Sequence, residues 1–163
     1  MIDPNLTGRE RVEAALENLK LNAEIVSPGT PMPTVPLAAE AVGCSVEQII
    51  KTVVFASPVG SPVIAIANGT NRIDRKRLAA AVHLDSLQLA DPQFVLETTG
   101  YEAGGVAPIG IRATGAPVVI DPAVLAQQSV YGGAGTEKDL LHIATTDLSR
   151  VTGACICPIT RQD

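Results

Sequence analysis

The sequence is poor in aromatic residues, which restricts both its core and its function. There is no Trp, and Phe and Tyr together make up 2% of the 163 residues. The hydrophobic core must therefore be aliphatic. Proteins that bind single-stranded nucleic acid stack bases on aromatic side chains. The aromatic residues of this chain are too few for such a platform: Phe55, Phe94, Tyr101 and Tyr131.

The sequence also lacks a long apolar segment. No stretch approaches the roughly 18 apolar residues that a membrane helix needs, and the opening segment MIDPNLTGRE is polar, unlike a signal peptide. We therefore expect a cytoplasmic protein with no membrane partner. The formal net charge of −5 argues against general nucleic-acid binding, so any RNA contact has to come from a local basic patch.

Cysteine and histidine are too sparse to indicate a metal site. Cys155 and Cys157 alternate in an apolar, strand-like segment, and His83 and His142 stand at no spacing typical of zinc ligands. No GxSxG segment or Ser–His–acid pattern indicates a nucleophile supplied by the protein. We therefore expect no metal and no cofactor. If the protein is an enzyme, we expect it to work without a protein nucleophile.

What the sequence does have is aliphatic residues in short segments with clear boundaries. Hydrophobic residues make up 46% of the chain and charged residues 18%, which is typical of a globular protein. Apolar residues at helical spacing predict a helix over 8–20, with a capping box formed by Thr7 and Glu10. β-branched runs at 51–57 and 62–69 predict a hairpin.

Capping residues and apolar runs predict the remaining elements. Short helices are expected over 35–43, from 45, over 74–82, 91–100, 121–127 and 145–153, and strands at the start of 21–33 and over 116–121, 139–144 and 154–159. The helices and strands do not alternate regularly as in a doubly wound sheet. We therefore predict a mixed α/β fold for residues 1–163, a single domain with one largely antiparallel mixed β-sheet surrounded by short helices.

Lys51 stands in an apolar context, EQIIKTVVF. An ordinary lysine at a strand end covers apolar surface with its stem and reaches water with its ammonium group. Alternatively, the ammonium group points into a pocket, where it can bind a phosphate or polarise a carbonyl. Spacing alone leaves both interpretations open.

The segment GYEAGGVAPIG, residues 100–110, is rich in glycine and has a single charged side chain. It lacks the Gly-Lys-Ser/Thr ending of a phosphate-binding loop, and a proline stands where a dinucleotide fingerprint would begin a helix. A flexible linker fits poorly because Pro108 stiffens the chain. Two interpretations remain: an ordinary turn, or a rigid wall where a ligand approaches the main-chain N–H groups at Gly104 and Gly105.

One segment, NGTNRIDRKR, concentrates positive charge in this acidic protein. A solvated helix face is the ordinary explanation of such a run. Alternatively, a phosphate backbone that docks on the protein should dock here. The candidate tRNA-binding residues are Arg72, Arg75, Lys76 and Arg77.

Several short motifs occur in a fixed order. They are AAEAVG at 38–43, KTVVF at 51–55, GYEAGGVAPIG at 100–110, PVVID at 117–121, GGAGT at 132–136 and DLSRVTGA at 147–154. In this order they resemble the YbaK/prolyl-tRNA-synthetase-associated domain family, over about residues 30–157. Characterised members of that family are aminoacyl-tRNA deacylases, which hydrolyse the ester that links a wrong amino acid to the tRNA 3′ end. The resemblance implies a mixed α/β fold of the same type.

The resemblance also implies roles for individual residues. The strand lysine of the family matches Lys51, which would hold the substrate near its terminal adenosine. Gly104 matches the first glycine of the Gly-Gly pair, where loop amides contact the aminoacyl group. Catalysis would be substrate-assisted, in agreement with the missing nucleophile. The other candidate substrate-binding residues are Thr34, Thr52, Gly105, Pro108, Gly110 and Gly135.

The chain departs from the family pattern at two places. Thr136, Glu137 and Lys138 replace a basic Gly-Arg-Gly segment, and Thr34 stands where some members carry an aromatic residue. We expect trans-editing of mischarged tRNA, of the Cys-tRNA(Pro) or Ala-tRNA(Pro) type. The alternative is a non-catalytic module that binds an aminoacyl-adenosine or docks on a synthetase. The expected partner is the aminoacylated tRNA 3′ end; a prolyl-tRNA synthetase is one candidate protein partner, and the oligomeric state is left open.

Overall fold

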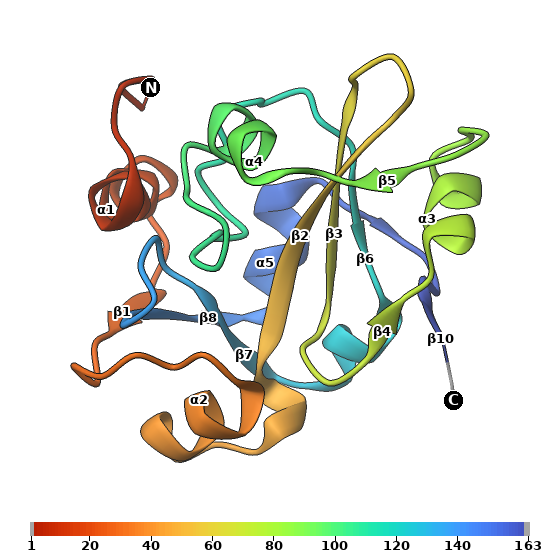
Figure 1. Ribbon diagram of the computed structural model, residues 1–163. Coiled ribbons are helices and arrows are strands. Elements are labelled where there is room, and N and C mark those ends of the chain that lie inside the picture. The colour runs from red at the N-terminus through yellow and green to blue at the C-terminus, as the bar shows by residue number, and fades with distance from the viewer. Residues whose placement is uncertain (1, 162–163) are drawn as a thin grey trace.

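A long antiparallel hairpin forms the centre of the structure (Figure 1). In the computed structural model, which describes residues 2–161, β2 (Ile50–Ala56) and β3 (Pro62–Asn68) pair over their whole length. They belong to a five-stranded sheet of order β5-β2-β3-β6-β9. β5 is antiparallel to β2, whereas β6 is parallel to β3 and β9 to β6. The remaining strands of this sheet are β5 (Gln88–Leu89), β6 (Val118–Ile120) and β9 (Cys155–Ile156).

Two smaller antiparallel sheets complete the strand arrangement. One has the order β1-β8-β7, formed by β1 (Glu24–Val26), β8 (Leu140–Ala144) and β7 (Ser129–Gly133). The other pairs β4 (Arg72–Ile73) with β10 (Thr160–Arg161), which brings the C-terminal segment beside the middle of the chain.

The helices are short, and α2, α3 and α4 begin at capping residues that the sequence indicates. Asp74 and Asp91 accept hydrogen bonds from the first-turn N–H groups of α3 and α4, and a proline follows Asp91 in the first turn. Gly43, Gly100 and Gly153 end their helices in the left-handed conformation. The helices are α1 (Gly8–Leu19), α2 (Val35–Val42), α3 (Arg75–Ala81), α4 (Pro92–Thr99) and α5 (Thr145–Thr152), with 3₁₀ turns at Val46–Gln48 and Pro122–Ala126.

The alternation of side chains along the central strands gives the sheet two buried faces. Val54 and Ile66 point into the larger core, where α1, α4, α5 and the β1-β8-β7 sheet cover the sheet. Phe55 and Ala65 point into a second cluster, which Leu78 of α3 and the C-terminal segment cover. Both faces are mostly aliphatic, as the composition predicts, with Phe55 and Tyr101 as aromatic members of the two clusters.

Most of the predicted elements are confirmed, and the mixed α/β class is confirmed with them. The strands, however, are divided among three sheets rather than one. The segment predicted as a helix over 121–127 forms only a 3₁₀ turn, and the strand β7 was not predicted. Thr7 stands at the N-cap of α1 without a capping hydrogen bond from its side chain. Within residues 2–161, no helix is long and apolar enough to cross a membrane.

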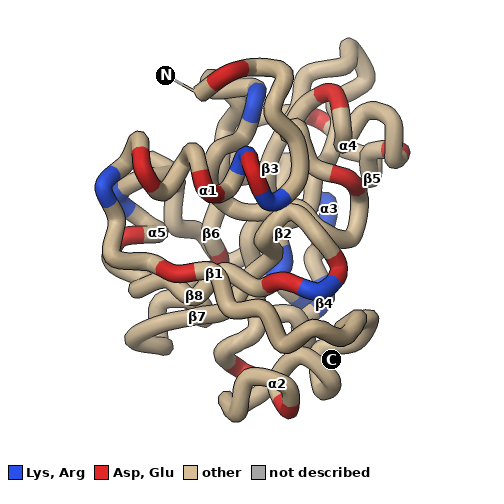
Figure 2. The backbone as a smooth tube through the Cα atoms, turned by 90° about the vertical axis from the view of Figure 1, so that its left-hand side faces the viewer, with Lys and Arg blue, Asp and Glu red and all other residues tan. Residues whose placement is uncertain are grey.

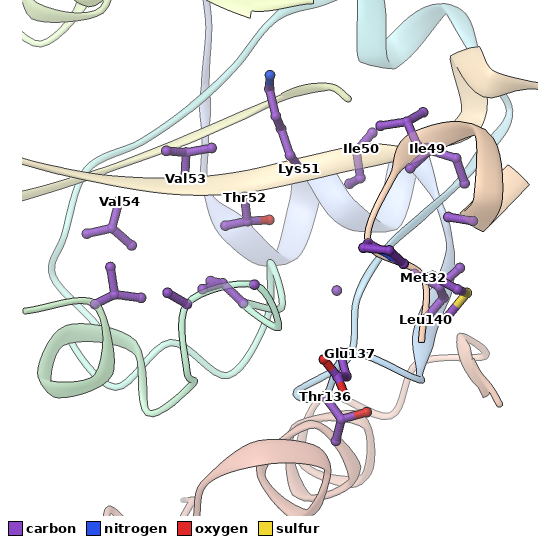
Figure 3. Close-up of a pocket in the computed structure, with 18 of the residues that line it drawn as sticks. Met32, Ile49, Ile50, Lys51, Thr52, Val53, Val54, Thr136, Glu137 and Leu140 are labelled. Atoms are coloured by element: carbon purple, nitrogen blue, oxygen red, sulfur yellow. The ribbon is translucent and has the colours of Figure 1, made fainter. Parts of the chain in front are cut away.

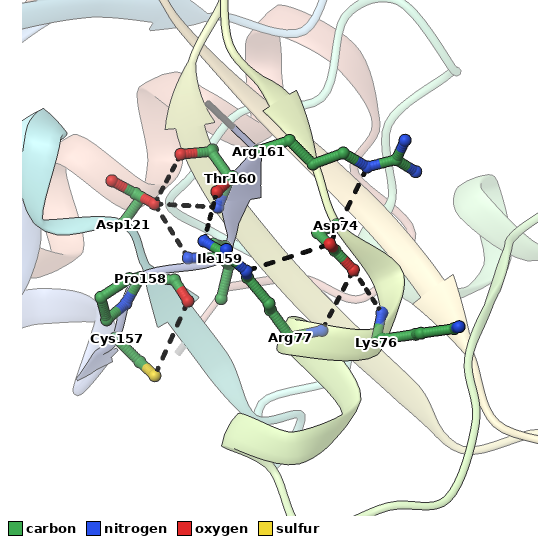
Figure 4. A network of polar contacts seen from close by, with 9 residues as sticks. All are labelled: Asp74, Lys76, Arg77, Asp121, Cys157, Pro158, Ile159, Thr160 and Arg161. Atoms are coloured by element: carbon green, nitrogen blue, oxygen red, sulfur yellow. Dashed lines mark hydrogen bonds and ion pairs between the residues drawn. The ribbon is translucent and has the colours of Figure 1, made fainter. Parts of the chain in front are cut away.

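Asp121 ties the C-terminal segment to the central sheet (Figure 4). Its buried carboxylate caps the following 3₁₀ turn through the N–H of Ala123. The second carboxylate oxygen accepts from the N–H groups of Ile159 and Thr160 and from the hydroxyl of Thr160, at 2.9, 3.2 and 3.0 Å. Asp121, the aspartate that ends the apolar stretch PVVID, therefore has a structural role, because its hydrogen bonds hold β10 in place beside β4.

The glycine-rich segment 100–110 is closed on itself by two buried side chains. The hydroxyl of Tyr101 donates to the carbonyl of Ile109 at 2.7 Å, and the guanidinium of Arg11 donates to the carbonyl of Gly110. Both side chains are almost completely buried. The segment is therefore an ordered loop rather than a linker.

The same loop packs backbone against backbone on the segment 133–136. The N–H of Gly135 donates to the carbonyl of Gly105 at 2.8 Å. A Cβ atom at Gly133 would lie 2.2 Å from the carbonyl oxygen of Val106, and one at Gly135 would lie 2.2 Å from the backbone of Gly8. Only glycine allows these backbones to approach so closely.

We predict that Gly133→Ala destabilises the fold, because the added methyl group forces the two backbones apart. Overpacking costs about 1–3 kcal/mol, which corresponds to a fall in Tm of roughly 2–4 °C for each kcal/mol in a protein of this size. Thermal unfolding measures the change. Gly115→Ala is the control, because nothing lies within 4 Å of a Cβ atom at that position. Equal Tm values for the two variants would contradict the close packing.

Candidate functional site

A cavity of about 540 Å³ lies beside β2, at the edge of the central sheet. Its walls come from the loop before α2, from β2, from the start of α4, from the glycine-rich loop and from the segment that leads into β8 (Figure 3). Six consecutive residues line it, from Ile49 to Val54. A cavity over one face of a strand would touch only alternate residues. This cavity therefore runs along the edge of β2, where the backbone of successive residues can line it.

The lining is mostly aliphatic, with a few polar groups. The apolar residues come from elements far apart in the sequence, among them Val35, Ala38, Ile50, Val54, Val95 and Leu140. No motif in the sequence marks the residues of this apolar wall. Its only signal in the sequence is the apolar character of the segments, which also describes any buried core.

Lys51 lines the cavity, but its ammonium group is turned away from the glycine-rich loop. Its Nζ donates to the carbonyl of Asn71 at 2.6 Å and lies 3.5 Å from that of Gly69. Figure 3 shows Lys51 and Thr52 on opposite sides of β2. Lys51 therefore borders the cavity, but its ammonium group binds the turn between β3 and β4 and does not point into the cavity, as the pocket interpretation required. Desolvation by burial lowers the pKa of Lys51.

Thr52 and Thr34 supply hydroxyl groups to the cavity. The Oγ1 atom of Thr52 is buried and has no hydrogen-bond partner within the described chain. An unpaired buried hydroxyl costs free energy unless a ligand or water satisfies it. Thr34 lies at the mouth, where its side chain caps α2 by accepting from the N–H of Leu37 at 3.3 Å.

Gly104 lies on the cavity wall, and Gly105 lies behind it. The φ angle of Gly104 is +94°, in the region that favours glycine, and nothing lies within 4 Å of a Cβ atom built there. Gly105 is buried against Gly135 and Thr136. The predicted amide wall is thus exposed at Gly104, whereas Gly105 and Gly135 support it from behind.

The structure places Pro108 and Gly110 at a different hollow, which they share with Ile2, Leu19 and Val151. The carbonyl of Gly110 is held by Arg11, and a Cβ atom at Gly110 would lie 2.7 Å from the hydroxyl of Tyr101. Their predicted contact with the substrate is therefore corrected to a structural role, in closing the loop.

The segment before β8 carries an acidic residue that the sequence did not single out. Asp139 accepts hydrogen bonds from Arg9, Ser27 and Thr136 at 2.9, 2.5 and 2.6 Å. Burial alone would raise the pKa of Asp139, but the hydrogen bonds from Ser27 and Thr136 and the charge of Arg9 lower it. This network anchors the segment on which Glu137 is exposed at the cavity.

The basic segment lies beside the turn that binds Lys51. Arg72, Arg75, Lys76 and Arg77 are exposed, and Arg72 is paired across the ladder with Arg161, which the sequence did not group with them. The guanidinium of Arg77 donates to the carbonyl of Thr160 at 2.9 Å, and Asp74 lies 3.9 Å from Arg77 and 3.8 Å from Arg161 (Figure 4). On the side of the molecule that carries α1 and α5, basic and acidic positions are interspersed instead (Figure 2).

Neither histidine is among the residues that line the cavity. His142 stacks on Tyr131 with ring centroids 4.2 Å apart, and its Nε2 lies 2.9 Å from the hydroxyl of Ser129. His83 is exposed, just after α3. Among residues 2–161, no group of three or more His, Cys, Asp or Glu side chains is arranged to hold a metal ion.

Three comparisons give the relationship of the chain to known proteins. The proline–tRNA ligase of Pelobacter propionicus is 29% identical over 147 residues, which cover 90% of this chain and 25% of the ligase. The chain thus spans about a quarter of that relative's length. A protein of Enterococcus faecalis provisionally named Cys-tRNA(Pro)/Cys-tRNA(Cys) deacylase EbsC is 26% identical over 125 residues, 77% of this chain and 76% of that protein.

A crystal structure provisionally described as a trans-editing enzyme for prolyl-tRNA synthetase superposes with a TM-score of 0.87. The two sequences are 29% identical, and the match covers 99% of this chain and 100% of the other. The family model of the aminoacyl-tRNA editing domain matches residues 30–151, which include β2, the glycine-rich loop and the segment 133–140. The chain therefore belongs to the aminoacyl-tRNA editing domain family.

Proposed function

We propose that the protein hydrolyses the ester between an amino acid and a mischarged tRNA, acting in trans on Cys-tRNA(Pro) or Ala-tRNA(Pro). The observation that carries this proposal is the cavity along β2, which combines an aliphatic wall, exposed backbone at Gly104 and a lysine in a chain of the editing family. The relative named as a deacylase and the structure described as a trans-editing enzyme support the same reaction.

The aliphatic wall suits a small, uncharged amino acid. A synthetase pocket discriminates weakly against a substrate that is smaller by one methylene, by only about 1–3 kcal/mol. A second site that hydrolyses the smaller product corrects the error. Valine and alanine side chains such as Val35, Ala38 and Val54 leave room for alanine or cysteine and bind no charge.

The chemistry requires little from protein side chains. Water adds to the acyl carbon, the bond to the ribose oxygen breaks, and free amino acid and uncharged tRNA leave. Backbone N–H groups aimed at the developing oxyanion are worth roughly 3 kcal/mol each in known enzymes. The exposed backbone at Gly104 supports such a role. The two histidines lie elsewhere in residues 2–161, which favours attack by a water that the substrate itself positions.

The surroundings of Lys51 suggest the path of the tRNA. The turn that binds its ammonium group ends at Asn71, and the basic side chains of the segment begin directly after it, with Arg72. A terminal adenosine near Lys51 would therefore lead its phosphates past Arg72, Arg75 and Lys76. The similarity to one part of a proline–tRNA ligase supports tRNA(Pro) as the substrate and a prolyl-tRNA synthetase as a partner.

We predict that the protein deacylates Ala-tRNA(Pro) or Cys-tRNA(Pro) and that Lys51→Met lowers kcat/KM by about 10- to 100-fold. This range corresponds to the loss of one hydrogen bond from a charged group, about 1.5–3 kcal/mol. Release of radiolabelled amino acid measures the rate. Lys20→Met on the surface after α1 is the matched control. Binding of an aminoacyl-adenosine without hydrolysis of any charged tRNA would identify a non-catalytic module instead.

We predict that Gly104→Val abolishes deacylation while the protein remains folded. The site is exposed and has room for a side chain, but the φ angle of +94° strains any residue except glycine. The side chain and the altered backbone would then remove the amide from the cavity wall. Circular dichroism verifies folding. A normal rate of deacylation would refute the role of this amide.

We predict that Arg75→Glu combined with Lys76→Glu weakens tRNA binding and reduces its dependence on salt. Each lost phosphate contact lowers the slope of log K against log salt by about 0.7–0.9. Arg77 is left intact because it holds Thr160. The control carries the same charge reversal after α1 and on α5, as Lys20→Glu with Arg150→Glu. If both variants bind tRNA equally, the docking surface lies elsewhere.

A further inference from the structure

Along the open edge of β2, hydrogen bonds identify which backbone groups face the cavity. The carbonyl of Ile49 accepts from the N–H of Gly69 on the β3 side, whereas the carbonyl of Val54 accepts from the N–H of Ala90 on the opposite side, at 2.8 and 3.0 Å. In an antiparallel strand, the backbone groups of alternate residues point to the same side. Thr52 therefore directs its N–H and C=O away from β3 and toward the open edge.

No strand in residues 2–161 continues the pairing at Thr52. Phe55 pairs with Leu89, so the same register would place residue 92 opposite Thr52. That residue is Pro92, which has no N–H and begins α4. From the other end, β7 approaches β2 through a bridge between Ile49 and Tyr131.

The open position is thus a gap of about one residue between two neighbouring strands. Within it lie the N–H and C=O of Thr52, together with a buried hydroxyl, Oγ1, that has no partner in the described chain. The cavity runs along this gap. Buried polar groups without partners are rare in proteins, and the unpaired hydroxyl of Thr52 beside an edge that no ladder continues indicates a place for a ligand.

We propose that Thr52 recognises the main chain of the amino acid, which pairs with the edge of β2 as a single added residue. The N–H of Thr52 donates to the ester carbonyl, and its C=O accepts from the α-ammonium group. This inference rests on the proposed function, since it takes an aminoacyl ester as the ligand. Such an ester carries an acceptor and a donor on either side of one Cα atom, as a strand residue does, and peptides add to sheet edges through the same groups.

This pairing separates two tasks within the cavity. The edge of β2 identifies the ligand as an α-amino acyl group whatever its side chain, while the aliphatic wall selects the side chain by size. In this pairing the N–H of Thr52 donates to the carbonyl oxygen of the ester, which becomes negative when water attacks. This hydrogen bond therefore stabilises the transition state more than the ester.

The variant Thr52→Pro tests whether the N–H of Thr52 donates to the ester carbonyl. The N–H of Thr52 lies outside the ladder with β3, so proline, which is tolerated where an N–H faces away from the sheet, removes mainly the cavity-facing donor. Thr52→Val is the matched control, because it keeps the N–H and loses only the hydroxyl. We expect kcat/KM on Ala-tRNA(Pro) to be at least tenfold lower for Thr52→Pro than for Thr52→Val. Similar values in two folded variants would overturn the proposal.

A binding experiment on the unaltered protein tests it independently of catalysis and of whether Thr52→Pro folds. The probe is alanine joined by an amide to 3′-amino-3′-deoxyadenosine, which cannot be hydrolysed as an ester. We expect the NMR signal of the Thr52 amide proton to move downfield on binding and to exchange more slowly with water. A lactyl probe, with a hydroxyl in place of the ammonium group, should bind at least tenfold more weakly.

The two proposals fail in different ways. If the alanyl probe shifts the Thr52 amide but no charged tRNA is hydrolysed, the pairing stands and the deacylase proposal falls. If the protein hydrolyses Ala-tRNA(Pro) while the Thr52 amide is unmoved by the probe, the deacylase stands and the pairing is wrong. Equal affinity for the alanyl and lactyl probes would also overturn the contact with the α-ammonium group.

Discussion

The candidate site depends on one contact, between the backbones of 104–106 and 133–136. The N–H of Gly135 binds the carbonyl of Gly105, and Gly133 leaves no room for a Cβ atom against Val106. These two segments form one wall of the cavity and are separated by almost thirty residues of chain. Because no side chain stands between them, the wall is stiff, and Gly104 can present its backbone at a defined place.

The opposite wall depends on an interruption of the central sheet. β5 pairs with only the last residues of β2, and the chain then turns at Pro92 into α4. A longer β5 would cover Thr52 and fill the edge. The interruption leaves Thr52 without a strand partner on this side, and its buried hydroxyl has no partner in the described chain, which costs stability in the free protein. Such a cost is characteristic of binding sites, since a ligand recovers it.

The cationic groups and the aliphatic wall lie toward different parts of the structure around the cavity. The cationic groups lie toward the turn at Gly69–Asn71 and the segment that follows it, and the aliphatic wall lies toward α2 and α4. Asp139, the buried acid near the cavity, is fully occupied by Arg9, Ser27 and Thr136. An already activated ester needs little more than orientation and an oxyanion donor, and in the proposed mechanism the backbone supplies both.

The sequence by itself determined the elements and the family. Capping residues such as Asp74 and Asp91, the β-branched hairpin and the glycines act locally, through hydrogen bonds and φ angles within a few residues of each. Ordered motifs in the same chain indicated the editing family and singled out Lys51 and Gly104 as candidate site residues. The roles of Pro108 and Gly110 were mistaken, because proximity in sequence to Gly104 did not imply proximity to the cavity.

The tertiary structure alone decided what each of these residues faces. Lys51 and Thr52 are neighbours in the chain, but strand alternation sends their side chains to opposite sides of β2, and only the packing of the sheet shows which side meets the glycine-rich loop. Contacts between residues distant in sequence also decide three further features. These are the division into three sheets, the pairing of Arg72 with Arg161 and the open edge at Thr52. Local sequence carries no signal for them, because they arise from register and from which backbones can approach one another.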